Sequence, residues 1–268
     1  MYPVLVDFGW WQLRAYGVFF AIALAVGIWW SAREGERHGF RRALVYDFAQ
    51  WVALAGLVGA RLYYVIVSEP ATYVARPWEI LAVWHGGLSV HGGLIGGLAA
   101  ALWFVRRRGL PFWPFADAVV PGLVLGQTVG QIACLLNGDT FGQPTTLPWA
   151  IVFTDPQAMA PLGVPLHPIQ VYELLAYLLV FLVVQKVARS AVPPGTALMT
   201  YALLYGAGRF GLEFFRGDPP VIAGIIVAQA VSALLVAAGA VGLWRLRLLP
   251  WRRHVNASGG RRDYPNVQ

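Results

Sequence analysis

Seven apolar stretches, each close to the length of a bilayer-spanning helix, constrain this chain more than any other feature of its sequence. A helix that crosses the hydrocarbon core of a membrane needs about 20 mostly apolar residues. The sequence therefore predicts an all-α, polytopic membrane protein with about seven transmembrane helices. The stretches lie at Ala15–Ala32, Val45–Val67, Leu88–Val105, Phe115–Leu136, Ile169–Val184, Gly195–Phe215 and Val221–Trp244.

The composition agrees with a membrane protein and argues against a disordered chain or a soluble enzyme. Hydrophobic residues make up 58% of the chain and charged residues only 12%, whereas a soluble domain averages about 25% charged residues. The 12 Trp and 11 Tyr are typical of membrane interfaces. Cys134 is the one cysteine, so an intramolecular disulfide and a Cys-rich metal site are excluded. The five histidines lack ligand spacing, and we expect neither a metal nor a cofactor.

The basic residues fall in alternate connections between the apolar stretches. Of the 20 Lys and Arg residues, 15 follow the first, third, fifth and seventh stretches, and only Arg14, Arg76 and Arg216 lie on the opposite side. The positive-inside rule then places the N-terminus outside and the C-terminus in the cytoplasm. The net charge of +7 reflects this topology and contact with anionic lipid head groups. We therefore expect no nucleic-acid partner.

The same pattern predicts a simple domain organisation. Residues 1–250 form a single integral-membrane domain with an extracytoplasmic loop at about 137–168, which is rich in proline. Loops of this length are usually functional or disordered. Within it, the mostly apolar run Leu147–Phe153 fits either a short strand or an interfacial segment. The polar residues 251–268 are expected to form a disordered cytoplasmic tail.

Several polar residues lie inside or at the edges of the apolar stretches. A charged side chain at the bilayer centre costs about 2.5–3.5 kcal/mol on insertion scales, so such residues are candidates for function. Tyr205, Arg209 and Glu213 have i, i+4, i+8 spacing and share one helix face, where Arg209 and Glu213 can pair. The other intramembrane candidates are Arg61, His91, Cys134, Gln170 and Glu173, and most of these residues fall toward the outer leaflet.

Each of these residues also has a structural explanation. Arg209 and Glu213 can form a purely structural ion pair, His91 can simply be hydrogen-bonded, Arg61 can snorkel to the interface, and Cys134 can be a packing residue. Because the polar clusters gather toward one leaflet, they together favour a site for an anionic lipid head group. Arginine binds phosphate oxygens through a planar fork, and a neutral histidine can accept a proton from a nucleophile.

At these motifs the chain resembles the bacterial phosphatidylglycerol–prolipoprotein diacylglyceryl transferase family. The resemblance runs from Tyr16 to about Arg216, and its motifs occur in consistent order. They are Tyr16-Gly17, Gly59-Ala60-Arg61-Leu62, the glycine-rich sequence from Gly86 to Leu94, His167 to Glu173, and Tyr205 to Arg216. Family members transfer the diacylglyceryl group of phosphatidylglycerol to the lipobox cysteine of a prolipoprotein, and glycerol phosphate leaves.

The resemblance also implies roles for individual residues. His91 matches the family histidine that is proposed to act as base for the thiol. Arg209 matches an arginine that holds the phosphate, with Glu213 as its partner. Tyr16 and Tyr205 match tyrosines that are important for activity. The expected location is the bacterial inner membrane, and the expected partners are phosphatidylglycerol, prolipoproteins with a lipobox cysteine and membrane lipid.

The family signature, which corresponds to Gly130–Gly142 here, departs from its usual form. Gln131 replaces an arginine that helps to bind the lipid phosphate, and Cys134 replaces an asparagine. Asp139 keeps a carboxylate but is one methylene shorter than the usual glutamate. Losing one charge-assisted hydrogen bond costs about 1.5–3 kcal/mol. The resemblance implies a substrate-binding set of Arg61, Gln131, Cys134, Asn137, Asp139, Gly142 and Arg209.

Two other functions stay open at this point. Gln131 and Cys134 are compatible with a related membrane enzyme that uses a different phospholipid or acceptor. A lipid transporter or scaffold without chemistry belongs to another class. Transporters often show paired halves with broken helices at the midplane, and the chain has no such duplication.

Overall fold

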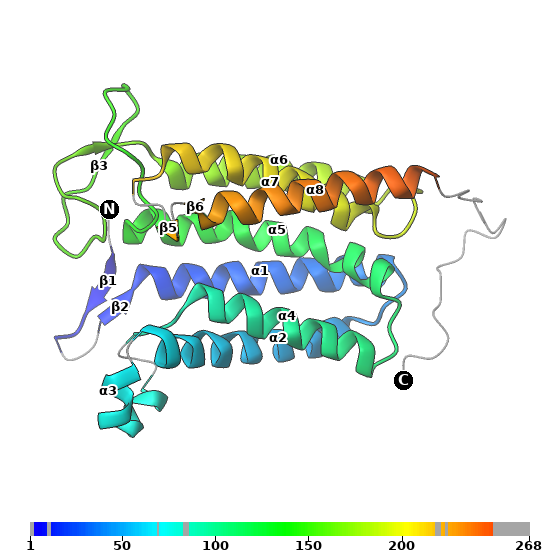
Figure 1. The fold of residues 1–268 in the computed structure, drawn as a ribbon, viewed down its shortest axis with the longest axis horizontal. Helices are drawn as coiled ribbons and strands as arrows, with labels where there is room; N and C mark the ends of the chain where they lie inside the picture. The colour runs from blue at the N-terminus through cyan, green and yellow to red at the C-terminus, as the bar shows by residue number, and fades with distance from the viewer. Residues whose placement is uncertain are drawn as a thin grey trace.

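In the computed structural model, residues 3–9, 12–68, 70–82, 86–217, 221–222 and 225–248 are described. Within these residues, seven long helices run side by side along the longest axis of the molecule (Figure 1). They are α1 (Ala15–Arg37), α2 (Arg42–Tyr63), α4 (Val90–Arg107), α5 (Phe112–Asn137), α6 (Ile169–Ala188), α7 (Thr196–Leu212) and α8 (Val227–Leu248). The expected tail at 251–268 lies outside the described residues.

The short elements gather at one end of the helices, on the left in Figure 1. They form three two-stranded antiparallel pairs and a few single turns of helix. The pairs are β1 (Val4–Asp7) with β2 (Gln12–Arg14), β3 (Ile151–Val152) with β4 (Pro165–Leu166), and β5 (Val221–Ile222) with β6 (Ile225–Ile226). The helical turns are η1 (Tyr64–Ser68), α3 (Pro70–Ala75), η2 (Pro77–Leu81) and η4 (Glu213–Phe215).

Five helical segments among the described residues are long and apolar enough to cross a membrane. These are α1, α2 continued by η1 to Val67, α5, α6 and α8. The other two long helices fall short for different reasons. With 17 residues, α7 is below the length of about 20 that a span needs, and α4 ends in Arg106 and Arg107. The predicted helical membrane protein is confirmed, whereas the count of seven spans and the orientation stay predictions.

Each predicted stretch corresponds to one long helix, but most boundaries differ by a few residues, and three of these differences have a local physical reason. The seventh stretch was placed from Val221, yet this residue lies in a strand and α8 begins at Val227. The local run of β-branched Val and Ile favours a strand over a helix start. The helix of the third stretch, α4, begins at Val90 rather than Leu88. It follows Gly86 and Gly87, which have φ of 90° and 76°. The helix of the sixth stretch, α7, ends at Leu212 rather than Phe215, and the chain continues as the 3₁₀ turn η4.

Glycines bring three pairs of helices into backbone contact. In the α2–α4 pair, a methyl group on Gly92 would overlap the Gly59 carbonyl oxygen, and one on Gly59 would overlap the Gly92 carbonyl oxygen. Gly27 and Gly122 join α1 to α5 in the same way, and Gly239 joins α8 to α7. Small residues permit such close packing in membranes, where no hydrophobic driving force brings helices together. Gly92, next to His91, is thus a point where the backbones of α2 and α4 meet.

The connection between α5 and α6 is ordered by a small core of its own. Phe153, Ala160 and Leu166 are buried together and are surrounded by other apolar residues of the same connection. The apolar run Leu147–Phe153 contains strand β3, which pairs with β4 just before α6. This packing fixes the residues on both sides of the connection, which are Asp139 to Gln143 and His167 to Gln170.

The opposite end of the bundle holds basic helix ends and two buried carboxylates. Glu34 is fully buried and contacts Arg189 at 2.6 Å and Arg37 at 3.5 Å. Asp117 accepts hydrogen bonds from the backbone N–H groups of Gly195 (2.6 Å) and Leu198 (2.9 Å) at the start of α7. These contacts tie α1, α5, α6 and α7 together far from the end that carries the strands.

Candidate active site

An ion cluster of four residues lies where α6 begins and α7 ends. Arg209 contacts the carboxylates of Glu173 at 2.9 Å and Glu213 at 2.7 Å. Arg216 lies 3.9 Å from each of the same carboxylates. We call Glu173, Arg209, Glu213 and Arg216 the Arg209 cluster. The predicted pair of Arg209 and Glu213 is confirmed, and Glu173 from α6 completes it.

The Arg209 cluster is buried and electrically balanced. The side chain of Glu213 is fully buried, that of Glu173 is 4% exposed, and that of Arg209 is 16% exposed. Two guanidinium groups and two carboxylates cancel in formal charge, which lowers the cost of burying them. Both close contacts of Arg209 use Nη1. Its Nε and Nη2 atoms make no hydrogen bond within the described part of the chain, so one edge of the guanidinium fork stays available.

The signature residues at the end of α5 lie against this cluster. Gln131 lies beside the Glu173 carboxylate, which places the residue that replaces the family arginine directly next to the ion pairs. The Tyr16 side chain from α1 faces Cys134 and Asp139. Gln170 donates a hydrogen bond from Nε2 to the Asp139 carbonyl oxygen at 2.7 Å. Together with Arg209 on α7, residues of four helices therefore contribute to one polar region.

Asp139 follows α5 and carries the remaining carboxylate of this region. Burial raises the pKa of Asp139. The neighbouring Asn137 and Cys134 side chains and the positive charge of Arg216 act in the opposite direction but do not outweigh burial. The amide of Asn137 also contacts the Met159 sulfur at 3.3 Å, in the connection to α6.

Backbone hydrogen bonds from two neighbouring segments hold the end of the signature in place. The Gln143 N–H donates to the Phe215 carbonyl oxygen (2.8 Å), and the His167 N–H donates to the Gln143 carbonyl oxygen (3.0 Å). Between them, Gly142 forms an antiparallel bridge with Arg216. A methyl group on Gly142 would lie 2.6 Å from the His167 Cβ atom and would also overlap the His167 carbonyl oxygen. Only glycine fits here, and its position fixes Arg216 relative to Asp139.

Several buried polar atoms around the cluster have no hydrogen-bond partner in the described part of the structure. One of these atoms belongs to Thr140, which is the one non-glycine residue with positive φ (55°) among the described residues. A β-branched residue in this conformation is strained. Buried polar groups are normally paired. These atoms therefore mark a place where a polar ligand can bind. They are Gln131 Oε1, Asp139 Oδ1, Thr140 Oγ1, Gln170 Oε1 and Arg216 Nε, together with both carboxylate oxygens of Glu213, which are ion-paired but not hydrogen-bonded.

Tyr205 belongs to a stack of three tyrosines beside the cluster. Its ring lies 5.4 Å from that of Tyr177 and 5.2 Å from that of Tyr201. The Tyr201 hydroxyl is held by the Gln127 amide of α5, whose Nε2 donates to it at 3.0 Å. Tyr205 is thus positioned by α5 and α6, one helical turn before Arg209.

His91 lies in a second polar region at the same end of the molecule. It is exposed in the first turn of α4, with its ring 6.1 Å from that of Tyr63. The helices α1 and α5 lie between the α2–α4 pair and the group formed by α6, α7 and α8 (Figure 1). No hydrogen bond, ion pair or ring contact connects His91 with the Arg209 cluster within the described residues.

Arg61 belongs to the region of His91 and is engaged with backbone carbonyls. Its Nη1 donates to Gly86 (2.5 Å) and Gly87 (2.9 Å), its Nε donates to Ile80 (3.0 Å), and its Nη2 donates to Glu79. The guanidinium also lies over the Tyr73 ring, 5.2 Å from its centroid. All three guanidinium nitrogens are therefore used by the segment that leads into His91.

The structure thus divides the residues that the sequence singled out into two regions. Around the Arg209 cluster it brings together Tyr16, Gln131, Cys134, Asn137, Asp139, Gly142, Tyr205, Arg209 and Glu213. It places His91 and Arg61 in the other region. No group of three or more His, Cys, Asp or Glu residues suited to a metal ion occurs among the described residues.

Three residues belong to the site more closely than the sequence indicates. The sequence lists Glu173 and Gln170 among the intramembrane candidates without placing them beside Arg209, and it counts Arg216 among the outer basic residues. Each lies within a motif, from His167 to Glu173 or from Tyr205 to Arg216. Those motifs were the available signal, but pairing across helices cannot be read from spacing within one helix.

Comparison with known proteins gives one consistent result. Residues 3–245 match the family model described as prolipoprotein diacylglyceryl transferase. Proteins named phosphatidylglycerol–prolipoprotein diacylglyceryl transferase are similar to this chain over most of both lengths. The protein from Synechococcus elongatus is 38% identical, covering 90% of this chain and 86% of its own. That from Thermosynechococcus vestitus is 36% identical, with coverages of 90% and 91%, and one from a Nostoc species is 35% identical, with 92% of each.

Proposed function

Because the chain belongs to the prolipoprotein diacylglyceryl transferase family, we propose that its Arg209 cluster holds the phosphodiester of phosphatidylglycerol. The protein transfers the diacylglyceryl group of this lipid to prolipoproteins, the first step of lipoprotein lipidation. One observation carries the assignment of the lipid site. Two buried carboxylates hold Arg209 through Nη1, while the edge formed by Nε and Nη2 stays available for phosphate oxygens.

In this proposal all seven long helices cross the inner membrane of a bacterium. The N-terminus lies outside, the C-terminus lies in the cytoplasm, and residues 1–250 form one membrane domain. The basic residues at the ends of α1, α4, α6 and α8 support this orientation, because all four helices end at the same side of the bundle. Both polar regions then face the outer leaflet.

The reaction replaces a carbon–oxygen bond by a carbon–sulfur bond. The lipobox cysteine of the prolipoprotein gives up its thiol proton to a ring nitrogen of His91. Its thiolate attacks the glyceryl carbon that bears the phosphodiester oxygen. The C–S bond forms as the C–O bond breaks, and glycerol phosphate leaves with the electron pair of that bond. A neutral histidine suits this role because an imidazole can accept and release a proton at neutral pH.

Arg61 receives a different role from the one that the sequence implied. Its donors already satisfy carbonyl groups on both sides of residues 83–85, which lie outside the described part. A phosphate would have to displace several of these hydrogen bonds. We therefore assign Arg61 to positioning the segment that ends at His91, and leave the phosphate to Arg209.

The signature residues define how strongly the lipid head group is held. With Gln131 in place of an arginine, the cluster is neutral and offers hydrogen bonds without an extra charge. Tyr16, Cys134, Asn137, Asp139 and Gly142 adjoin the Arg209 cluster, and Tyr205 lies one helical turn before Arg209. The unpartnered polar atoms around Asp139 and Thr140 are suited to the glycerol hydroxyl groups. Lipid affinity therefore depends on Arg209 more than in a site with two phosphate-binding arginines.

The names of the relatives favour a transferase over a transporter or scaffold, and the transfer itself is directly measurable. The purified protein is mixed with phosphatidylglycerol and a lipobox peptide, and the peptide mass is followed. We expect a gain equal to one diacylglyceryl group, which is absent with a Cys→Ser peptide and strongly reduced with the His91→Ala protein. Phosphatidylethanolamine and cardiolipin serve as competing lipids. Absence of any gain with well-folded protein, or faster transfer from a competing lipid, would contradict the proposal.

A further inference from the structure

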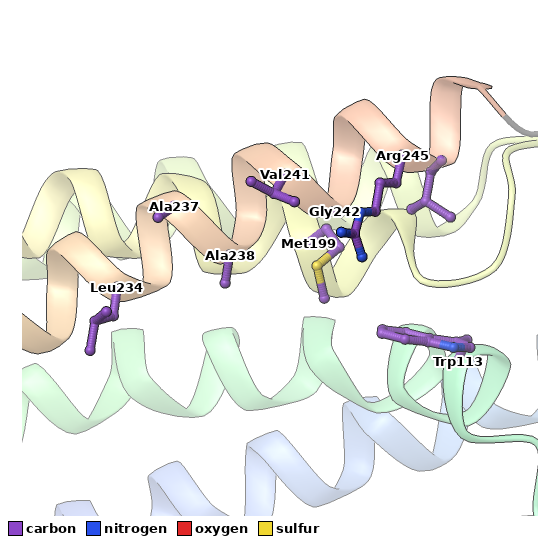
Figure 2. Close-up of a pocket in the computed structure, with 9 residues that line it drawn as sticks. Trp113, Met199, Leu234, Ala237, Ala238, Val241, Gly242 and Arg245 are labelled. Atoms are coloured by element: carbon purple, nitrogen blue, oxygen red, sulfur yellow. The ribbon is translucent and has the colours of Figure 1, made fainter.

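A groove between α8, α7 and the start of α5 lies at the end of the molecule opposite the candidate active site. Figure 2 shows its walls, with Leu234, Ala238 and Val241 on α8, Met199 on α7 and Trp113 on α5. Its volume is about 590 Å³. Apart from one arginine, its lining is apolar.

The groove exists because α8 presents small residues toward α5. Along its length, α8 packs on α7, where Gly239 meets the Met199 carbonyl oxygen. Three of the α8 residues that line the groove, Ala237, Ala238 and Gly242, are small and leave the space beside them unfilled. A methyl group on Gly242 would collide with the Met199 side chain, 2.7 Å from its Cγ atom. An apolar space of this kind inside a bilayer is suited to hydrocarbon rather than to water.

Arg245 closes the groove at its polar end. In Figure 2 its guanidinium points from α8 into the space between Met199 and Trp113. It makes no ion pair or hydrogen bond with any described residue, although other arginines at this end, such as Arg189 and Arg37, have Glu34 as a partner. The neighbouring Trp244 is 62% exposed, which is typical of the membrane interface. The Arg245 guanidinium therefore lies at the level expected for lipid head groups, at one end of an apolar groove.

The length of the groove matches one leaflet. From Leu234 to Arg245 a helix rises by about 16 Å, and one leaflet contributes about half of a hydrocarbon core of ~30 Å. An acyl chain that runs along α8 from Arg245 would therefore reach the bilayer centre near Leu234.

We propose that this groove binds one acyl chain of an anionic phospholipid from the leaflet at the basic end of the bundle, with the lipid phosphate on Arg245. This site goes beyond the transfer reaction, because it lies at the other end of the helices from Arg209 and His91 (Figure 1). The bound lipid fills the space between α8 and α5 and fixes α8 relative to the rest of the bundle. Anionic lipids are preferred because the surrounding helix ends are basic.

The test uses phosphatidylglycerol with a photoreactive diazirine in its acyl chain, added to the full-length protein in nanodiscs. Labelled peptides are then mapped by mass spectrometry, which separates this groove from the catalytic end. We expect labelling of α8 around Ala238 that falls about tenfold in Arg245→Gln, because a charge-assisted contact is lost. Arg247→Gln is the matched control, since Arg247 is a cation on the same helix that does not line the groove.

One further variant and one further lipid probe extend this test. Ala238→Trp fills the groove and should abolish the labelling of α8 while leaving labelling at the catalytic end unchanged. A phosphatidylcholine probe with the same diazirine should label α8 several-fold less than phosphatidylglycerol. Equal labelling of α8 in Arg245→Gln and Arg247→Gln, or equal labelling by the two lipids, would overturn the proposal. Because both arginine changes are at exposed positions, this comparison does not depend on whether Ala238→Trp folds.

Discussion

Arg61 and Arg209 are both largely buried at the same end of the bundle, but their charges are balanced in different ways. Arg209 is surrounded by the carboxylates of Glu173 and Glu213 and keeps one edge of its guanidinium available. Arg61 donates from every nitrogen to backbone carbonyls and also lies over the Tyr73 ring. The first arrangement lets a ligand bind without disturbing the fold, whereas the second holds a chain segment in place.

The comparison shows that an arginine inside a membrane protein is not by itself a phosphate site. What distinguishes a binding arginine is the number of its donors that the protein leaves unused. By this measure we propose that the Arg209 cluster binds the lipid and that Arg61 shapes the region of His91. The two roles lead to different consequences of substitution, which the following variants separate.

The largest effect is expected for Arg209→Met. Removing the cation leaves Glu173 and Glu213 buried without their nearest partner, and breaking a buried pair in this way costs about 3–5 kcal/mol. We expect a lower free energy of unfolding and no measurable transfer. Thermal unfolding in detergent and the peptide-mass assay measure the two effects. Adding Glu173→Gln to Arg209→Met should restore part of the stability but none of the activity, and a single variant as stable as the wild type would contradict the account.

Arg61→Lys should have a smaller effect of a different kind. Lysine is a point charge with three donors and cannot reproduce the planar contacts to four carbonyl groups. We expect kcat to fall by about tenfold, which corresponds to the loss of one or more hydrogen bonds from a charged group, while the KM for phosphatidylglycerol stays the same. Initial rates at varied lipid fraction give this split, and the exposed Arg76→Lys serves as control. A raised KM with unchanged kcat would instead make Arg61 a phosphate ligand.

The close contact between α2 and α4 gives a prediction with an internal control. Gly92→Ala places a methyl group against the Gly59 carbonyl oxygen and must push the two helices apart, at a cost of about 1–3 kcal/mol. Gly97→Ala, on the same helix, meets its nearest neighbour on Val52 at an ordinary 3.6 Å. Activity and melting temperature should both fall in Gly92→Ala and change little in Gly97→Ala. Equal behaviour of the two variants would show that this contact does not position His91.

The smallest effect concerns Asp139 and depends on pH. Because burial raises the pKa of Asp139, the folded protein holds this proton more tightly than the unfolded chain does. Stability from this group is therefore present below the pKa of a free aspartate, about 3.9, and is lost as pH rises through the folded-state pKa. Asp139→Asn should be slightly more stable than the wild type at neutral pH, and the difference should shrink toward pH 4. Melting curves of both proteins across this pH range measure the effect. A difference in stability between the two proteins that does not depend on pH would contradict the account.

The sequence predicts the helices and one side of the site well. Apolar length reveals the seven long helices, and spacing within one helix reveals the pair of Arg209 and Glu213. It does not reveal that Glu173 pairs with the same arginine, because that contact depends on how α6 and α7 are set against each other.

The part played by Arg61 could not be predicted for a related reason. Its partners are carbonyl groups of a connection that returns toward the end of α2, and carbonyl groups carry no sequence signal. Near Val221 the apolar run satisfies the composition of a helix, but local β-branched residues form a strand there, so hydrophobicity alone misplaces the start of α8. The sequence thus reveals contacts within one helix, whereas contacts between elements had to come from the structure.

The division of labour between the two regions is tested most directly by steady-state transfer kinetics of Arg209→Lys and His91→Ala under identical conditions. Phosphatidylglycerol is varied at a fixed, saturating concentration of lipobox peptide. The account predicts that Arg209→Lys raises the KM for the lipid by at least about tenfold, because the guanidinium fork is lost, while His91→Ala lowers kcat and leaves that KM unchanged. An unchanged lipid KM in Arg209→Lys, or full activity in His91→Ala, would contradict it.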